Sequence, residues 1–189
     1  MLKKNLIVAA LAVAGLMVGV SASAQTYVGG TVGTARLSYD CPTTVSCDKN
    51  ATAYQLFGGY SIDKNFAVEA SYFSAGTYKI AGVSSAKAFG ADAKADGYAI
   101  SGVAKFDVTD EFAIFGKLGW ARSTTKAEFT SGLTGSDKSS STDPVIGFGV
   151  TYKFSKELAL RAEFDSFRDR INSQKHTANA LTVGVQYAF

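Results

Sequence analysis

Cysteine, histidine and proline are scarce in this chain of 189 residues, which contains two cysteines, one histidine and two prolines. Cys41 and Cys47 have no histidine near them, so the usual ligand sets of a zinc site are missing. We therefore expect no metal and no other cofactor. No Pro-rich or Gly/Ser-rich linker divides the chain, and one domain is the natural count at this length.

Long apolar runs are also missing after Val20, where no stretch approaches the 18 consecutive apolar residues of a transmembrane helix. Charge of one sign is not in large excess. The formal net charge is +3, and it falls to +1 if Lys3 and Lys4 are removed with a leader segment. The sequence therefore indicates no nucleic-acid partner.

The first 24 residues have the three parts of a secretory signal peptide. Met1–Asn5 is short and basic, residues 6–20 are apolar, and Ala22-Ser23-Ala24 is a small-residue cleavage site. The apolar run is 15 residues long, shorter than the roughly 20 that an uncleaved membrane anchor would need. We predict that residues 1–24 are cleaved and that residues 25–189 form the mature domain.

The last nine residues, Leu181–Phe189, alternate strictly between apolar residues and small or polar ones. This period of two is typical of a β-strand with one apolar and one polar face. A soluble protein that ended this way would expose an apolar face and an unpaired edge. The closing strand of a barrel in lipid carries its apolar face outward, so the pattern favours a membrane barrel.

A turn unit recurs and sets the number of strands. Residues 62–68, 108–114 and 154–160 each contain an apolar residue, three polar residues, and then an apolar-Ala-apolar triplet, with starts 46 residues apart. Tight polar turns between alternating runs indicate hairpins. Four longer polar stretches alternate with these turns, at 38–51, 76–95, 124–142 and 169–178. Seven connections imply eight strands.

The predicted strands are each about ten residues long, which is the length that a tilted strand needs to cross a bilayer. They cover residues 26–36, 52–62, 66–75, 97–108, 112–123, 144–154, 158–168 and 179–189. The sequence thus predicts an all-β fold, an eight-stranded antiparallel up-and-down transmembrane β-barrel. The alternative is a soluble eight-stranded barrel, which would place its apolar face inside.

The charges decide between these alternatives, because each strand keeps its mid-strand charges on one face. A Lys or Arg on the lipid face at mid-depth costs about 2–4 kcal/mol, so the charged faces should line the lumen. This set contains Glu69, Lys105, Lys117, Lys153, Arg161, Glu163 and Asp165. Isolated charges away from water are expensive, so we expect these side chains to pair or to stay hydrated.

Aromatic residues near the strand ends match the girdles of a membrane barrel. Those expected at the short turns, on the periplasmic side, are Tyr60, Phe66, Phe112, Phe154, Tyr187 and Phe189. Those expected at the outer girdle or the lumen mouth are Tyr27, Tyr54, Tyr72, Tyr98 and Trp120.

Several segments resemble the transmembrane domain of outer membrane protein A. Phe57-Gly-Gly-Tyr60 followed by Phe66-Ala-Val-Glu69 is similar to strands 2 and 3 of that domain. Lys117-Leu-Gly-Trp120 and Leu160-Arg-Ala-Glu-Phe164 are similar to strands 5 and 7. The resemblance covers residues 25–189 and implies a barrel in the bacterial outer membrane, without the family's peptidoglycan-binding domain.

The resemblance also implies roles for lumen residues. In the family, a strand 3 glutamate exchanges ion-pair partners between a lysine and an arginine and so acts as a gate; the matching positions are Glu69, Lys105 and Arg161. Thr151 stands where the family has a second glutamate. The full set of gate candidates is Glu69, Lys105, Lys117, Arg161 and Glu163. The terminal aromatics Tyr187 and Phe189 match the signature that the barrel-assembly machinery reads.

The two cysteines lie in the first long loop of an exported chain, so we predict a Cys41–Cys47 disulfide. His176 lies in the last long loop, where we expect a solvated side chain. It is followed by Thr177 and Ala178, so the His-x-Ser pair of a lipid A deacylase is missing. We predict no catalytic residues and no enzyme activity.

The sequence predicts a structural and surface-interaction barrel that supports the envelope and makes contacts through its loops. The alternative is a narrow gated channel for ions or small solutes, since eight strands leave an interior that side chains just fill. Expected partners are outer-membrane lipid and lipopolysaccharide, the barrel-assembly machinery, and possible extracellular surface ligands. We expect a monomer.

Overall fold

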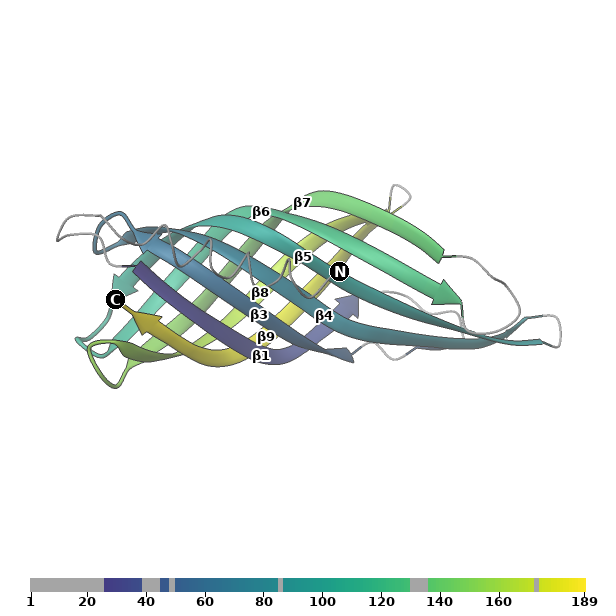
Figure 1. Cartoon of the computed structure of the whole chain (residues 1–189), viewed down its shortest axis with the longest axis horizontal. Helices are drawn as coiled ribbons and strands as arrows, with labels where there is room; N and C mark the ends of the chain where they lie inside the picture. Colours follow the sequence, from purple (N-terminus) through teal and green to yellow (C-terminus); the bar gives the residue numbers. More distant parts are fainter. Residues whose placement is uncertain (1–25, 39–44, 48–49, 85–86, 130–135, 172–173) are drawn as a thin grey trace, which may run out of the picture.

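The structure, a computed structural model, describes residues 26–38, 45–47, 50–84, 87–129, 136–171 and 174–189. The described strands are β1 (Thr26–Ser38), β2 (Val45–Cys47), β3 (Asn50–Ser61), β4 (Phe66–Ser84), β5 (Lys87–Asp107), β6 (Phe112–Phe129), β7 (Ser136–Lys153), β8 (Leu158–Ile171) and β9 (Gln174–Ala188). Eight long strands form the wall of a barrel, and β2 adds a short pairing to β4 (Figure 1). Among the described residues, no helix is long and apolar enough to cross a membrane.

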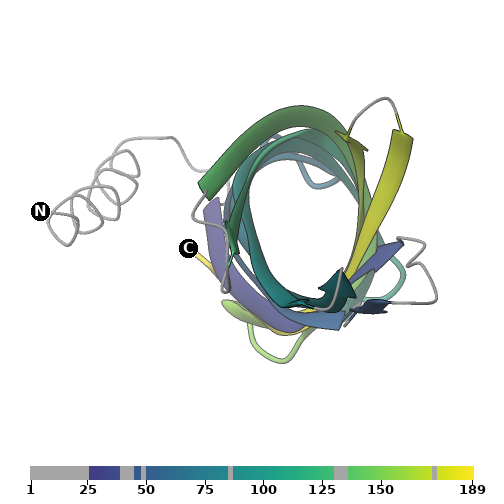
Figure 2. The same ribbon diagram turned by 90° about the vertical axis from the view of Figure 1, so that its right-hand side faces the viewer.

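The barrel is closed by antiparallel pairs all the way round (Figure 2). The first and last strands complete the ring, with Val28 opposite Tyr187 and Val32 opposite Val183. The last residue takes part, because the Phe189 N–H donates to the Thr26 carbonyl at 2.9 Å. The predicted eight-stranded antiparallel up-and-down barrel is confirmed, and closure leaves neither end strand with a free edge.

The recurring turn unit has a shared hydrogen-bonding scheme. In each turn the residue after the first apolar one has a side-chain oxygen that accepts from main-chain N–H groups two and three residues later. Asp63 accepts from Asn65 and Phe66 at 2.7 and 2.8 Å. Thr109 and Ser155 do the same in the other two turns. A short polar side chain at this position therefore lets the chain reverse within four residues.

The long polar stretches are only partly loops. The prediction that residues 76–95, 124–142 and 169–178 are loops is wrong over most of their length, since β4 continues to Ser84, β6 to Phe129 and β8 to Ile171. His176, predicted in the last loop, lies on β9, which begins at Gln174. The physical reason is that main-chain pairing continues beyond the lipid, where both faces of a strand meet water. The apolar alternation that marks a membrane strand stops there, although the strand does not.

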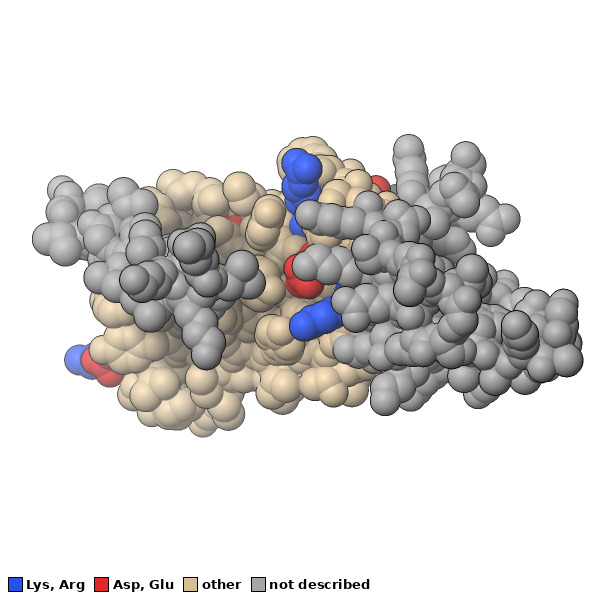
Figure 3. Space-filling model, turned by 45° about the vertical axis from the view of Figure 1, so that its right-hand side comes forward, with Lys and Arg blue, Asp and Glu red and all other residues tan. Residues whose placement is uncertain are grey.

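The two faces of the wall follow the predicted parity. Large apolar side chains on the outer face are widely exposed, for example Leu118 at 64% and Ile100 at 66%. Charged side chains of the opposite parity, such as Glu69 at 2% and Arg161 at 3%, are buried inside. In the space-filling view most of the described surface is uncharged, and charged side chains are visible at the short-turn end and where the described residues meet the grey ones (Figure 3). This arrangement fits lipid outside and excludes the soluble alternative.

Glycines make room for the large side chains of the lumen. A Cβ atom on Gly59 would collide with the ring of Tyr27, which lies directly opposite on β1. A Cβ on Gly147 would collide with Asp165 and with the stem of Lys117. Because protein interiors are packed to high density, the space left by these two glycines determines where the side chains of the lumen can lie.

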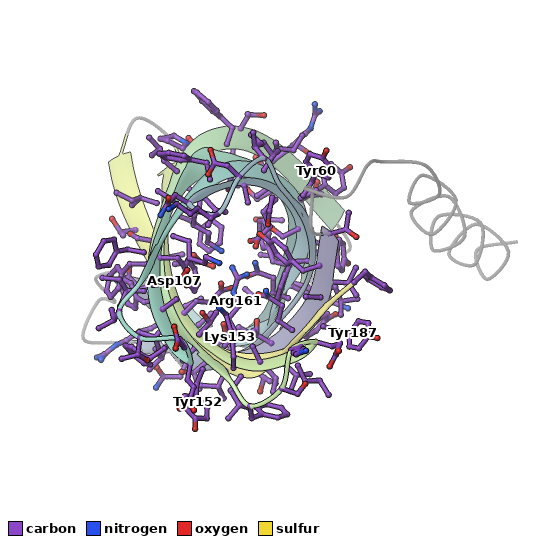
Figure 4. All side chains as sticks on the ribbon, turned by 90° about the vertical axis from the view of Figure 1, so that its left-hand side faces the viewer. Tyr60, Asp107, Tyr152, Lys153, Arg161 and Tyr187 are labelled. Atoms are coloured by element: carbon purple, nitrogen blue, oxygen red, sulfur yellow. The ribbon has the colours of Figure 1, made fainter. Side chains whose placement is uncertain are left out.

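Most of the aromatic residues predicted for the two girdles lie on the outer face, and Tyr27 does not. Tyr72, Tyr98 and Trp120 are exposed at 42%, 63% and 70%, next to the point where the outer face becomes polar. Tyr60 and Tyr187 lie outside the ring near the short turns (Figure 4). The assignment of Tyr27 to the outer girdle or the lumen mouth is corrected: it is buried inside the barrel near the short-turn end, because it shares the inward parity of β1.

Candidate functional site

A cluster of charged side chains fills the middle of the lumen. Glu69 comes from β4, Lys117 from β6, and Arg161, Glu163 and Asp165 from alternate positions of β8. All five are at most 5% exposed. Because alternate residues of a strand point the same way, β8 presents a guanidinium and two carboxylates to the same interior. We call these five residues the lumen cluster.

Glu69 and Arg161 form the central pair of the lumen cluster. Arg161 Nη1 donates to Glu69 Oε2 at 2.7 Å, and Nη2 donates to Oε1 at 3.0 Å. This two-point geometry is the strong form of an arginine–carboxylate contact. The hydroxyl of Tyr27 also donates to Glu69 Oε2, at 3.0 Å. The sequence analysis did not predict this role of Tyr27. Tyr27 lies on the same face of β1 as the polar Thr31, and this shared face was a usable signal that Tyr27 points into the lumen.

The guanidinium of Arg161 has further contacts besides Glu69. Its Nε and Nη2 lie 2.8 and 2.6 Å from Glu163 Oε2. Its guanidinium carbon lies 4.1 Å from the ring centre of Phe57 and 4.4 Å from that of Phe115. Cations are attracted to aromatic faces, and the attraction grows when water is excluded. The guanidinium therefore has little freedom to move without breaking several contacts.

Lys117 contacts all three carboxylates of the lumen cluster. Its Nζ lies 2.9 Å from Asp165, 3.4 Å from Glu163 and 3.9 Å from Glu69. The contact with Asp165 is within hydrogen-bond distance, and the contact with Glu69 is looser. Lys117 is thus the second cation of the network, and Glu69 lies within reach of both cations.

Lys105 does not join the lumen cluster. The β5 residue opposite Glu69 is Ser101, and Lys105 lies four residues away, about 13 Å along a strand. Its Nζ lies 3.7 Å from Asp107 Oδ1, and Lys153 Nζ lies 3.7 Å from the same oxygen. The structure therefore brings together four of the five gate candidates, with Asp165 added, and places Lys105 nearer the short turns.

An apolar layer lies on the far side of the lumen cluster from the short turns. Val145, Ala99 and Ala121 are almost fully buried and pack with Phe73 and Phe167. The two phenylalanine rings are 4.8 Å apart, centre to centre. Apolar constrictions exclude water and hydrated ions. The lumen therefore holds an ionic layer and, next to it, an apolar layer formed by residues of β4 to β8.

The remaining predicted sites are the cysteine pair, which lies partly outside the described residues, and the terminal aromatic pair. Cys41 is outside the described residues, and only the main chain of Cys47 is described, so the disulfide stays a prediction. Tyr187 and Phe189 stack edge to face at 5.0 Å on the outer side of the closing strand. Among the described residues, no group of three or more His, Cys, Asp or Glu side chains is placed to hold a metal ion.

Comparisons with known proteins agree with this architecture. The family model of the OmpA-like transmembrane domain matches residues 21–189. Outer membrane protein A of Salmonella typhi is 26% identical over 204 residues, covering 100% of this chain and 56% of the relative. Outer membrane protein A of Shigella flexneri is 27% identical over 155 residues, covering 78% of this chain and 43% of the relative. The chain thus spans about half the length of these curated relatives.

Solved structures with the same fold include small surface barrels. Ail of Yersinia pestis, crystallised in complex with the heparin analogue sucrose octasulfate, superposes with a TM-score of 0.61 at 17% identity, covering 89% of this chain and all of Ail. Neisserial surface protein A gives a TM-score of 0.63 at 16% identity, covering 87% and 97%. From the closed barrel and the matching family model, we conclude that this chain belongs to the OmpA-like transmembrane domain family and is a β-barrel of the bacterial outer membrane.

Proposed function

We propose that the chain is a structural barrel whose strands beyond the membrane make contacts at the cell surface. The observation that supports this role is that buried side chains fill the lumen. The charged residues of the lumen cluster are at most 5% exposed, and the apolar layer covers them on one side. An interior filled by paired charges and apolar side chains suits a rigid support better than a conduit.

The long strands supply the surface for such contacts. β4 and β5 contain 19 and 21 residues, whereas about ten residues suffice to cross a bilayer. Their hairpin projects from the end opposite the short turns (Figure 1), which is the extracellular end in bacterial barrels. The similarity of fold to Ail, which was crystallised with a sulfated sugar analogue, is compatible with polar ligands at this end.

A gene deletion complemented with variants tests this proposal. A chain in which residues 79–92 are replaced by a two-residue turn should restore resistance of the envelope to detergent and bile salts but lose adhesion to surfaces. The wild-type chain should restore both properties. The proposal fails if the shortened chain adheres as well as the wild type, or if the deletion changes neither property.

A narrow gated channel is the alternative function, and the contacts of Lys117 favour one version of it. Glu69 lies within 3.9 Å of Lys117 while it is paired with Arg161, so an exchange of partners would need only small movements. In this version Lys117 takes the role that the family resemblance implies for Lys105. Single-channel recordings in planar bilayers test it: Glu69→Ala should change the conductance, and Lys105→Ala should not.

The remaining expectations belong to the same proposal. Residues 1–24 act as a cleaved signal peptide, which the N-terminal sequence of the protein purified from membranes would test. Tyr187 and Phe189 act as the assembly signal for the barrel-assembly machinery, Cys41 and Cys47 form a disulfide, and the barrel is a monomer in contact with lipid and lipopolysaccharide. Catalysis has no part in this proposal.

A further inference from the structure

A cavity of about 500 Å³ opens at the short-turn end of the barrel. Its lining includes Arg161 of the lumen cluster, together with Phe115, which contacts Arg161, and Tyr27, which contacts Glu69. Its side walls include Lys105 and Lys153. This volume is within the range of small-molecule sites. We call it the turn-side cavity.

The two lysines of the turn-side cavity share one poorly placed carboxylate. Lys105 Nζ and Lys153 Nζ each lie 3.7 Å from Asp107 Oδ1, and the three side chains are 35%, 39% and 41% exposed. A good contact between an ammonium group and a carboxylate is about 2.7–2.9 Å long. Asp107 therefore satisfies neither cation well. Asp107, Lys153 and Arg161 lie near one another on the same side of the ring when the barrel is viewed from this end (Figure 4).

The walls between the charged groups are apolar or small. Ala67, Val103 and Ala159 line the cavity beside the two lysines, and Phe115 is also part of its lining. Three of the four carboxylates that line the cavity accept hydrogen bonds near the short turns. Asp63 accepts from the main chain, Glu157 from the Ser155 hydroxyl at 3.2 Å, and Glu111 from the Tyr152 hydroxyl at 3.5 Å. The lining contains five basic side chains, Lys64, Lys105, Lys153, Lys156 and Arg161, against four acidic ones, Asp63, Asp110, Glu111 and Glu157.

We propose that the turn-side cavity is a binding site for a small organic anion, a carboxylate or a phosphate ester, entering from the periplasmic side. The anionic group bridges Lys105 and Lys153 and displaces Asp107, and the apolar walls contact the rest of the ligand. Asp107 lies within 3.7 Å of both lysines when no ligand is bound. This inference is independent of the surface role and of the channel.

Binding can be measured on the chain folded in octyl glucoside micelles, whose headgroup carries no charge. Sodium phosphate and sodium succinate serve as probes at constant ionic strength, with sodium chloride as the reference, and amide chemical shifts as the readout. Each probe should give saturable shifts at Lys105, Lys153 and Val103. The relative affinity of the two probes then distinguishes a phosphate ligand from a carboxylate one.

Matched variants separate this site from general charge effects. Lys105→Gln and Lys153→Gln should each weaken binding about tenfold or more, whereas Lys64→Gln and Lys156→Gln, at the mouth of the same cavity, should change it less than threefold. Asp107→Asn should strengthen binding at least threefold, a gain that misfolding cannot produce, and Asp110→Asn should have less effect.

The proposal is overturned if chloride gives the same shifts as the probes or if neither probe saturates. Equal losses in the wall and mouth lysine variants would also overturn it. So would an Asp107→Asn variant that binds the probes no better than the wild type. The surface role proposed above would stand in each of these cases.

Discussion

Replacing Glu69 with alanine is the sharpest test of how the lumen holds the barrel together. Glu69 accepts two hydrogen bonds from Arg161, at 2.7 and 3.0 Å, and one from Tyr27 at 3.0 Å. Removing one partner of a buried ion pair costs about 3–5 kcal/mol, because the other charge is left uncompensated. Arg161 keeps its contacts with Glu163 in this variant, so we expect a loss near the lower limit, about 3 kcal/mol.

The loss can be measured by urea unfolding of the protein in lipid vesicles. The chain has a single tryptophan, Trp120, which is 70% exposed on the outer face and reports transfer between lipid and water. Tyr27→Phe removes one hydrogen bond to the same carboxylate and should cost less, about 1.5–3 kcal/mol. Asp110→Ala, in an exposed turn, should change the free energy of unfolding by less than about 0.5 kcal/mol.

A double-mutant cycle completes the test. Because Glu69 and Arg161 are in direct contact, the double variant Glu69→Ala with Arg161→Met should lose less stability than the sum of the single losses, by at least about 1 kcal/mol. If the losses were additive, or if Glu69→Ala were no worse than Asp110→Ala, the ion pair would not support the barrel and the reasoning would be refuted.

Three further predictions concern the wall. Gly59→Ala should lower the free energy of unfolding by about 1–3 kcal/mol, because its Cβ would collide with the Tyr27 ring. Gly58→Ala on the outer face, where a Cβ would have no contact closer than 3.7 Å, should be nearly neutral. Equal losses in the two variants would contradict the packing scheme. Leu118→Arg should cost about 2–4 kcal/mol in vesicles if this face meets lipid, and a neutral result would exclude that. The unboiled protein should migrate differently from the boiled protein on gels, and identical mobility would count against a stable barrel.

The number and order of the strands could be predicted because lipid imposes a simple rule. Residues that face lipid must be apolar and residues that face the lumen need not be, so Leu118 and Lys117 reveal opposite faces from the sequence alone. The turns could be predicted for a related reason. Asp63, Thr109 and Ser155 recur at equivalent positions because each supplies the oxygen that accepts the main-chain N–H groups of the turn.

The ends of the strands on the loop side could not be predicted. From Tyr98 on β5 toward the loop end, the outer face becomes polar, because the next residues on that face are Asp96 and Lys94. Strand pairing nevertheless continues, with Lys94 opposite Thr77 on β4. Main-chain hydrogen bonds do not depend on side-chain polarity, so the signal that marks a membrane strand carries no information about where its pairing ends.

The sequence by itself determined that this chain is a barrel, which faces are inward, and which charges share the lumen, because each of these follows from the alternation of residues along a single strand. Which charges meet was decided by the tertiary structure. Glu69 and Arg161 are 92 residues apart and face each other across the lumen, while Lys105 contacts Asp107. The register between strands and the space left by glycines set those distances, and neither can be read from one strand alone.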